Sequence, residues 1–500
     1  MPPRYHQDRD DALKPVAVID IGSNSIRMVV YDGAARTPQV LFNEKWVCAL
    51  GQGLDSSGRL NPEGVPQAVA ALARFVRLAR AMGAEAIDVL ATAAVRDADD
   101  GPEFVAAVEK RCGVAVTVLP GTREALLSAQ GIRCAIPDAD GTVADLGGGS
   151  LELAAIDHGR VGGATATLPL GVLRLAEAGG SGSGAVAQAI DRHLGGVEWL
   201  DGGRNRTLFA AGGALRALGL MLMAHVGHPL HVLDNFTLER AEAVRLLDLI
   251  ARQSRKSIEK VMGVSRRRIA HLPTAALVLD RLLVRVRPSR LVFSAWGMRE
   301  GRFFERLPPA VRRQDPLIAA CTRMAAAVGR FPAHAAELMA WMTPLFPDES
   351  AAERRQRLAA CLLGDLFWSE HPDYRAEQAF LRVIRMPVMG LDHPGRAALA
   401  LAVTARYQGD EEAEFTLPAR RLLDEEGQRR ARLIGLALRL AHTVTGGVPG
   451  LLRRTRLIKE RNVLVFALPR DAAFAPDLGD RRGERLARAA YLDRFEIRRA

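Results

Sequence analysis

The chain has 500 residues, of which 48% are hydrophobic and 25% charged. This is ordinary globular usage and excludes a disordered, collagen-like or coiled-coil protein; the length corresponds to about three domains. Lys and Arg number 68 against 57 Asp and Glu, a formal net charge of +11, so the surface should attract nucleic acid, acidic membrane or phosphate compounds. Aromatic residues are only 5%, which disfavours nucleic acid because single strands stack on aromatic side chains.

The cysteine pattern and the N-terminal residues bear on location. The five cysteines include no Cys-x-x-Cys pair, so neither a disulfide framework nor a structural zinc site is expected. Residues 1–14 are polar and predict a disordered or frayed tail without an apolar signal segment. We therefore expect a cytoplasmic protein with no membrane partner.

Strands and helices alternate through the first third of the chain. Residues 16–33, VAVIDIGSNSIRMVVYDG, predict a β-hairpin with a Gly-Ser-Asn-Ser turn. Helical periodicity over about 66–82 and about 102–111 alternates with the strands AIDVLAT and VAVTVLP, and a further helix is expected from Thr122 to about Cys134. This alternation predicts an α/β layer structure.

The opening pattern occurs a second time. The segment TVADLGGGSLELAAIDHG, residues 142–159, again has a strand, an Asp, an apolar residue, a glycine-rich turn and a strand. Asp20 and Asp145 begin matching loops, which predicts two similar α/β halves that face one another across a cleft. The second half continues through FAAGGALRALG and ends near LVFSAWGMREG.

The β signal nearly vanishes beyond about residue 308, where Ala, Leu and Arg recur at helical spacing, although RNVLVFALP suggests a strand or two near the end. Basic residues concentrate at 421–500 and at 252–290, with Arg266, Arg267 and Arg268 at the centre of the latter; such stretches are commonly solvated faces. The organisation that we expect is a tail at 1–14, α/β domains at 15–135 and 136–307, and a helical C-terminal domain at 308–500.

Both matching loops have the composition of a phosphate-binding turn. Small residues leave backbone N–H groups uncovered, and a ring of such donors can hold phosphate oxygens. The first loop could instead be a simple tight hairpin, whereas three consecutive glycines in the second cost more backbone entropy than a turn requires. The candidate phosphate-binding residues are Ser23, Asn24 and Ser25 in DIGSNS, and Gly147, Gly148, Gly149 and Ser150 in DLGGGS.

Charged residues near the loops each allow two interpretations. Asp145, and after it Asp20, could hold a divalent cation that offsets the charge of the phosphates. Arg96 in ATAAVRDA could clamp a phosphate or could cap a surface helix. Glu124 in GTREALLSAQG is, on local evidence, an ordinary capping residue of a helix N-terminus. A weaker candidate for contact with a nucleotide or a polymer is the turn AGGALRALG, through Gly212, Gly213 and Arg216.

Together these segments resemble the exopolyphosphatase and guanosine pentaphosphate phosphatase family, within the sugar kinase, heat-shock protein and actin superfamily. DIGSNSIRMVV, ATAAVRDA, GTREALLSAQG, DLGGGSLEL, AGGALRALG and GMREG follow the family's order over about residues 15–305. The resemblance implies two actin-like (ribonuclease H-like) domains that face a cleft, and an all-α, HD-like C-terminal domain. It also implies phosphate removal with magnesium, and a homodimer.

The resemblance also assigns roles. It makes Glu124 the catalytic carboxylate, the general base that activates the attacking water, and it makes Asp145 with Glu152 the residues that coordinate or orient magnesium, with Asp20 as a further candidate. It places the terminal and adjacent phosphates on the two loops and on Arg96. The scheme is physically coherent, because phosphoryl transfer mainly needs in-line positioning and cancellation of negative charge.

The C-terminal domain matches the family only loosely. Gly364-Asp365 stands where a metal-binding His-Asp pair would be, and Tyr407-Gln408 stands where the family has Tyr-His. We therefore expect no metal chemistry there, and interpret His371 and His393 as structural or surface residues. The domain is expected to bind the polymer or to make a dimer contact.

The predicted function is that of an exopolyphosphatase, which releases terminal orthophosphate from polyphosphate by magnesium-dependent hydrolysis. The alternative within the family is a guanosine pentaphosphate phosphohydrolase, with base recognition near Gly212-Gly213. A less favoured alternative is an ATP-dependent kinase or a nucleotide-gated binding protein of the same superfamily. If Arg266, Arg267 and Arg268 follow the polymer, neutralising them should weaken the binding of long chains more than that of short ones.

Overall fold

The computed structural model describes residues 14–178, 183–251, 271–408, 412–470 and 480–499. The chain forms two compact units, Met1–Gln314 and Asp315–Ala500, which we describe separately. Among the described residues, no helix combines the length and the apolar character that crossing a membrane requires.

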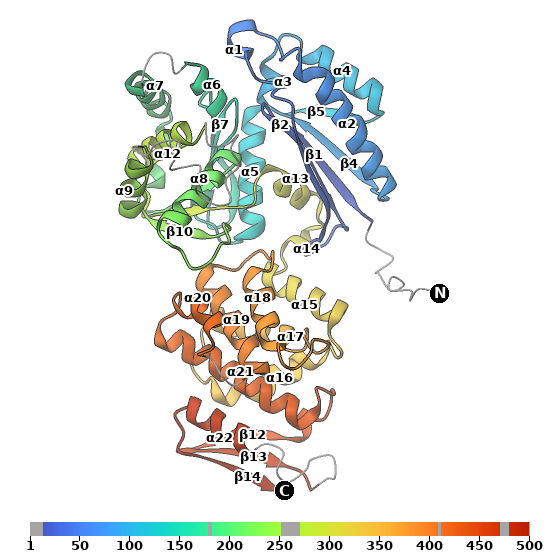
Figure 1. The fold of residues 1–500 in the computed structure, drawn as a ribbon, viewed down its shortest axis with the longest axis vertical. Helices are drawn as coiled ribbons and strands as arrows, with labels where there is room; N and C mark the ends of the chain where they lie inside the picture. The colour runs from blue at the N-terminus through green and yellow to red at the C-terminus, as the bar shows by residue number, and fades with distance from the viewer. Residues whose placement is uncertain (1–13, 179–182, 252–270, 409–411, 471–479, 500) are drawn as a thin grey trace. The chain divides into compact units, whose positions relative to one another are not determined.

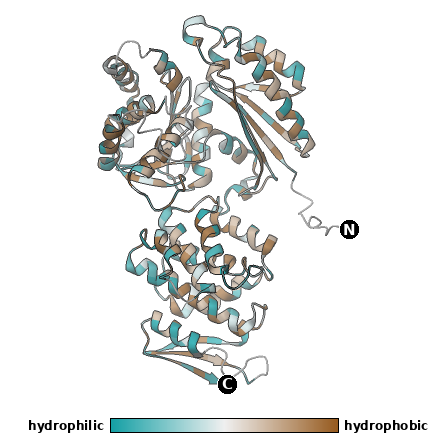
Figure 2. Ribbon diagram, in the orientation of Figure 1, coloured by the Kyte–Doolittle hydropathy of each residue, from teal (hydrophilic) through white to brown (hydrophobic). Residues whose placement is uncertain are grey.

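The first half of the N-terminal unit is a five-stranded sheet with the strand order β3-β2-β1-β4-β5. Helices α2 and α4 lie along it (Figure 1), and Figure 2 shows hydrophobic residues along its strands. Alternate apolar residues of the strands and of α2 form one buried core, as expected for a sheet covered by helices. The elements are β1 (Val16–Ile21), β2 (Ser25–Tyr31), β3 (Val40–Val47), α1 (Leu54–Ser57), α2 (Gly64–Ala81), β4 (Ala86–Ala91), α3 (Ala93–Asp97), α4 (Gly101–Cys112) and β5 (Val116–Val118).

The second half is a six-stranded sheet with the order β10-β11-β9-β6-β7-β8. Its strands are β6 (Gly141–Leu146), β7 (Leu151–Asp157), β8 (Arg160–Leu168), β9 (Thr207–Ala211), β10 (Phe236–Glu239) and β11 (Arg290–Phe293). Its helices include α6 (Val172–Ala178), α7 (Ser183–Gly195), α8 (Gly213–His225), α9 (Arg240–Ala251) and α12 (Leu272–Val286), and α14 (Pro309–Arg312) ends the unit. Helices α7, α8, α9 and α12 share one large apolar core with the strands.

The five strands of the first sheet have counterparts in the second, where β10 is an additional edge strand, and this confirms the expected pair of related domains. In the first, β1 pairs antiparallel with β2 and parallel with β4; in the second, β6 pairs antiparallel with β7 and parallel with β9. The registers also match, because Asp20 lies opposite Arg27 and Asp145 opposite Glu152, in each case two residues before the strand gives way to the loop. The fold therefore presents two equivalent loops from equivalent strand ends.

Two helices connect the halves. Helix α5 (Gly121–Ala135) packs on β7 and β8 of the second sheet, and α13 (Met298–Arg306) packs on β1 of the first sheet and along α5. The two helices approach so closely that glycine is required where they touch. A Cβ at Gly301 would lie 1.8 Å from the backbone oxygen of Leu127, and one at Gly131 would lie 2.1 Å from that of Gly297.

We expect Gly301→Ala to destabilise the protein by about 1–3 kcal/mol, because the added methyl group forces α5 and α13 apart. Denaturant unfolding measures the loss. The matched control is Gly184→Ala in α7, where a Cβ would meet no described atom within 4 Å, and where alanine favours the helix by up to about 1 kcal/mol. Equal unfolding free energies for Gly301→Ala and the wild type would contradict the close approach.

The C-terminal unit is a helical bundle with a small sheet. Its helices are α15 (Pro316–Val328), α16 (His334–Met342), α17 (Ala351–Leu363), α18 (Arg375–Arg385), α19 (His393–Tyr407), α20 (Leu417–Arg420), α21 (Glu425–Thr445) and α22 (Asp480–Ala489). Helices α19 and α21 pack together at the centre. Four of the helices begin at side-chain caps, Asp315 for α15, Ser350 for α17, Asp392 for α19 and Asp424 for α21.

The expectation that this domain is all-α was wrong in one respect. Strands β12 (Arg456–Glu460), β13 (Val463–Leu468) and β14 (Arg494–Arg499) form a three-stranded sheet in the order β12-β13-β14. Among these three strands, only β13 has a sequence apolar enough to predict a strand. The flanking strands read RLIKE and RFEIRR, since a small sheet with one solvated face needs few apolar residues at its edges.

Candidate active site

A cleft of about 210 Å³ lies between the two halves of the N-terminal unit. It receives residues from both loops, from the start of α5 and from the turn before α8. The sequence-predicted residues that line it are Asp20, Ser23, Asn24, Ser25, Glu124, Asp145, Gly147, Gly148, Gly149, Ser150, Glu152, Gly212, Gly213 and Arg216. Arg96 contacts one of these residues without lining the cleft itself, and Arg266, Arg267 and Arg268 fall outside the described residues.

The two loops are closed by the same hydrogen bond. The Gly22 N–H donates to the carbonyl oxygen of Ser25 at 3.1 Å, and the Gly147 N–H donates to that of Ser150 at 2.9 Å. The first loop is therefore a tight hairpin, as its alternative interpretation proposed, and the second has the same form. What each turn can bind depends on its remaining amide and carbonyl groups.

Carbonyl groups of both loops are engaged by other segments of the chain. In the first loop, the Ser23 oxygen accepts from the Gly51 N–H at 2.8 Å; in the second, the Gly148 oxygen accepts from the Leu173 N–H at 2.9 Å. Within the described chain, the amide N–H groups of Gly148 and Gly149 meet no acceptor. Amides that lie beside one another without an acceptor form a concavity suited to phosphate oxygens.

The loops also touch each other, which explains the glycines of the second. A Cβ at Gly149 would lie 2.9 Å from the Ser23 Oγ, and one at Gly148 would lie 3.1 Å from the Ser23 Cβ. A residue that sequence reasoning missed, Gly171, supports the second loop from behind, where a Cβ would lie 2.2 Å from the Gly148 oxygen. The geometry of the second loop thus depends on glycines both inside and outside it.

Glu124 lies in the first turn of α5, and the residue is only 6% exposed. One oxygen of its carboxylate accepts a hydrogen bond from the Arg96 guanidinium. Arg96 lies in the short helix α3 rather than directly after a strand, and it also donates to the Leu119 carbonyl at 3.0 Å and to Asp97 at 3.1 Å. Arg96 therefore holds the carboxylate and the loop before α5 together.

Burial governs the ionisation of the cleft carboxylates. It raises the pKa of Glu124 to about 8, against the attraction of Arg96, and the charges of Asp20 and Asp145 add to the increase. Burial also raises the pKa of Glu152 well above its ordinary value, and the nearby Glu124 raises it further. The pKa of Asp20 is likewise raised, first by burial. Without a cation in the cleft, these acids tend to keep their protons.

This raised pKa predicts a pH dependence of stability. An unfolded glutamate releases its proton near pH 4.5, whereas Glu124 in the folded, metal-free protein keeps its proton until about pH 8. Its contribution to stability is therefore complete at low pH and is lost as pH rises through about 8. Glu124→Gln removes this titrating group. We therefore expect the melting temperature of the variant to change less between about pH 5 and 9 than that of the wild type, with a difference in unfolding free energy of a few kcal/mol at most.

The matched control for that profile is Glu103→Gln. Glu103 is an exposed glutamate in the first turn of α4, as Glu124 is a buried one in the first turn of α5. Its substitution should leave the slope unchanged. Parallel profiles for Glu124→Gln and wild type would contradict the assigned pKa.

Two side chains that sequence reasoning missed hold the aspartates of the loops. The buried Ser128 hydroxyl, one turn after Glu124 on α5, donates to the Oδ2 of Asp145. The Arg299 guanidinium, on α13, donates to the Oδ2 of Asp20 at 3.0 Å. The signal for Ser128 was its i+4 spacing from Glu124, which puts both residues on one helical face, and Arg299 lies in the segment GMREG.

The first half also gives the cleft a basic wall. Arg27 lies opposite Asp20 on β2, and Lys45 lies opposite Arg27 on β3; both line the cleft. In the second half, the place equivalent to Arg27 belongs to Glu152. The equivalent strands therefore carry opposite charges, and a bound anion would meet cations on the first side and carboxylates, which can hold a cation, on the second.

The turn before α8 forms the side of the cleft next to Asp145. Gly212 has a φ of +90°, and a Cβ there would lie 2.5 Å from the Asp145 Oδ1. Arg216 donates to the Ala295 carbonyl at 2.9 Å, and burial lowers its pKa to about 10. Gly212 thus lets the backbone pass close to Asp145.

The cleft carboxylates fit an open cation site rather than a closed cage. In the part of the chain that the structure describes, three ligand groups come together only at Asp140, Asp157 and His158, where Arg206 already pairs with both aspartates. In the cleft, the buried Oε1 of Glu152 has no hydrogen-bond partner among the described residues. Magnesium prefers such a site, with one or two carboxylates completed by water and substrate phosphates.

The residues singled out in the C-terminal unit have structural contacts. Arg330 holds both oxygens of Asp365, at 2.6 and 3.0 Å, and the Tyr407 hydroxyl donates to the Gly364 carbonyl at 2.9 Å. His371 is exposed, whereas His393 is buried at the start of α19.

Comparison with known proteins identifies the family. The family model described as Ppx/GppA phosphatase family matches residues 29–310, and the model described as exopolyphosphatase, C-terminal, matches residues 317–497. The first match covers more than half of the chain. The protein therefore belongs to the Ppx/GppA phosphatase family.

Individual relatives are more distant. The chain is 35% identical over 177 residues to Exopolyphosphatase 2 of Mycobacterium tuberculosis, covering 33% of this chain and 55% of that protein, so the chain spans about half the length of that relative. It is 24% identical to Retrograde regulation protein 2 of Saccharomyces cerevisiae, covering 83% of this chain and 77% of that protein. A crystal structure titled as an exopolyphosphatase from Cytophaga hutchinsonii shares the fold, with 21% identity and a TM-score of 0.52 over 58% of this chain and 96% of that one.

Proposed function

We propose that this protein is an exopolyphosphatase, which hydrolyses the terminal phosphoanhydride bond of inorganic polyphosphate. The observation that carries the proposal is the cleft itself, which is lined by two glycine- and serine-rich loops, one of them with amides that meet no acceptor in the described chain, and by a buried carboxylate at the start of α5. Family membership and the name of the Mycobacterium tuberculosis relative support it. The net charge of +11 suits a polyanionic substrate.

Each part of the cleft has a task in this hydrolysis. The amides of Gly148 and Gly149 and the basic wall bind the terminal phosphates and compensate charge as the bond breaks. The Glu124 carboxylate accepts the proton of the attacking water, which then adds to the terminal phosphorus while the shortened chain leaves as its phosphate anion. Arg96 orients that carboxylate through its hydrogen bond to one of the two oxygens.

We further propose that the protein works with magnesium, held by Asp145 with Glu152 or Asp20. When bound, the ion would supply positive charge that offsets the charge of the phosphates. A cation here also favours ionised neighbours, so it would lower the pKa of Glu124 from about 8 and leave the base unprotonated at neutral pH. Ser128 keeps the Asp145 carboxylate turned toward the cleft.

Phosphate release from long polyphosphate and from guanosine pentaphosphate, measured side by side with magnesium, tests the substrate. The proposal expects turnover of polyphosphate; no turnover of polyphosphate would refute it. Guanosine pentaphosphate is the second candidate, because the Gly212-Gly213 turn borders the cleft beside Asp145, where a base could lie against open backbone. A higher kcat/KM for the nucleotide would favour that substrate. ATP-dependent phosphorylation of an added acceptor would instead indicate a kinase.

A further inference from the structure

The C-terminal unit contains a second, larger cavity, of about 500 Å³, to which the proposed hydrolysis assigns no role. It lies between the first half of α21 and the end of α22, and α19 and α20 complete it. Its volume is within the usual range for small-molecule sites. The cavity therefore has room for a ligand of nucleotide size.

The charged lining of this cavity is unequal. Four arginines face two glutamates: Arg420, Arg429, Arg432 and Arg488 against Glu412 and Glu425. Arg429 is already paired with Glu426, and Arg488 makes an exposed ion pair with Glu484 at 3.6 Å, a kind of contact that contributes little and that an anionic ligand can replace; guanidinium groups bind phosphate oxygens through paired N–H donors. The two carboxylates would repel a bare anion, but they can accept hydrogen bonds from a ligand that also carries N–H or O–H groups.

The wall of the cavity includes an unusual aromatic residue. Tyr491 is 78% exposed, the largest value among the exposed large hydrophobic side chains of the described chain. Its backbone has a φ of +56°, which a bulky residue rarely adopts, and its N–H donates to the Arg488 carbonyl at 3.1 Å. The chain turns sharply here and presents the ring to solvent beside the arginines.

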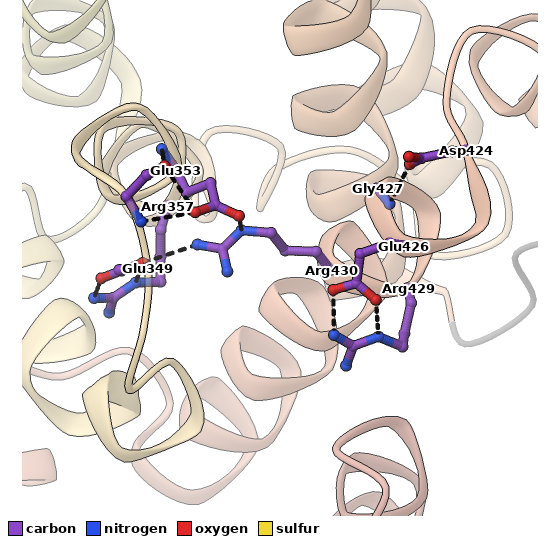
Figure 3. Close-up of polar contacts among 9 residues, drawn as sticks. Glu349, Glu353, Arg357, Asp424, Glu426, Gly427, Arg429 and Arg430 are labelled. Carbon is purple, nitrogen blue, oxygen red and sulfur yellow. Dashed lines mark hydrogen bonds and ion pairs between the residues drawn. The ribbon is translucent and has the colours of Figure 1, made fainter.

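The Tyr491 ring is fixed from one side by Arg429. The Arg429 guanidinium lies 4.8 Å from the ring centroid. Both carboxylate oxygens of Glu426 accept hydrogen bonds from this guanidinium, with 2.7 Å between Nε and Oε2, and the guanidinium also donates to the Ala489 carbonyl at 3.3 Å. Figure 3 shows Arg429 and Glu426 on α21. A guanidinium held in this way keeps the ring in place before any ligand arrives.

The helix that carries Arg429 is itself anchored. Arg430, the next residue, donates to Glu349 at 2.8 Å and lies 3.4 Å from Glu353, and the fully buried Arg357 holds Glu349 from the other side (Figure 3). These ion pairs attach α21 to the start of α17. Arg429 and Arg432 therefore stand on an anchored helix, as a specific site requires, whereas Arg488 belongs to α22.

We propose that this cavity is a binding site for a nucleoside di- or triphosphate. The base stacks on the open face of Tyr491, the phosphates bind Arg432 and Arg488, and the glutamates accept from the base edge or the ribose. Stacking on an aromatic ring beside basic side chains is a general way to bind nucleotides. A linear polyphosphate would use the arginines alone, would leave the ring without a role and would meet both carboxylates.

The test compares ATP with tripolyphosphate, which has the same phosphate chain without base or ribose. Binding of each is measured by calorimetry on the full-length Glu124→Gln protein, so that the result does not depend on turnover or on the function proposed for the cleft. We expect ATP to bind at least about tenfold more tightly than tripolyphosphate, and Tyr491→Ala to remove that difference. Tyr491→Phe, which keeps the stacking face, should retain it.

The matched control is Arg494→Ala. Arg494 is a similarly exposed arginine on β14 of the same unit that does not line the cavity, so its substitution should leave ATP binding unchanged. The double variant Arg432→Ala with Arg488→Ala should instead weaken the binding of both ATP and tripolyphosphate. If Tyr491→Ala does not fold, photolabelling of the full chain with 8-azido-ATP takes its place, with labelled peptides expected around residue 491. Equal affinity for ATP and tripolyphosphate, or labelling confined to residues 1–314, would overturn the proposal.

Discussion

Replacing Glu124 with glutamine should lower the turnover of polyphosphate by about 10²–10⁴-fold, the usual contribution of a general base. The amide has nearly the shape of the carboxylate, so the contact with Arg96 and the packing of α5 should persist, and the protein should still bind polyphosphate. Steady-state phosphate release gives kcat, and a direct binding measurement gives the affinity for the chain.

The control for this variant is Glu103→Gln, which makes the same chemical change in the first turn of another helix, at an exposed residue. It should keep full turnover. If Glu124→Gln retained wild-type kcat, the base would have to be another group of the cleft, and the assignment of Glu124 would fail. A loss of binding with unchanged kcat would make Glu124 a substrate ligand instead.

Removing magnesium should have an effect of similar size. Charge compensation by a bound cation is worth several kcal/mol in the transition state, so chelation with EDTA should lower turnover by about a thousandfold. Metal-free protein also holds the proton of Glu124 until about pH 8, so its residual activity should rise with pH through that value. Adding magnesium back should restore turnover and move the rise to lower pH.

Ser128 offers a graded version of this experiment. Ser128→Ala removes the hydroxyl that holds Asp145, so the magnesium concentration for half-maximal activity should rise about tenfold or more, the effect of one hydrogen bond to a charged group. Ser128→Thr keeps a hydroxyl and should be closer to wild type. Full activity in EDTA, or identical magnesium titrations for Ser128→Ala and wild type, would count against the proposed cation site.

Sequence patterns were sufficient for the central parts of the N-terminal unit. The repeated Asp and glycine-rich loops led directly to the paired halves, and the helix expected over about 66–82 is α2, Gly64–Ala81. These elements are predictable because buried strands and amphipathic helices have strong apolar periodicity. The loops are predictable because their small residues are required locally, by the turn and by the contact between Ser23 and Gly149.

The edge strands were not predictable in the same way. Strand β3 reads VLFNEKWV and β8 reads RVGGATATL, and most of their residues are exposed or half-buried. An edge strand with one solvated face carries charged, small and glycine residues, which weaken the alternation that identifies a strand. The contact of Arg299 with Asp20 joins residues 279 positions apart, and only the folded chain brings such residues together.

The packing of α5 and α13 has a consequence for dissecting the protein. The base-bearing helix α5 precedes the second half in the chain, yet its apolar face, including Ala125, Ala129 and Ile132, is buried against Val143 and Ala154 of the second sheet. A fragment that ended at residue 135 would expose that face, and a fragment that began at residue 136 would leave its sheet uncovered. Neither half should be stable as a separate recombinant fragment, so the smallest autonomous piece that contains the cleft extends from β1 through α13.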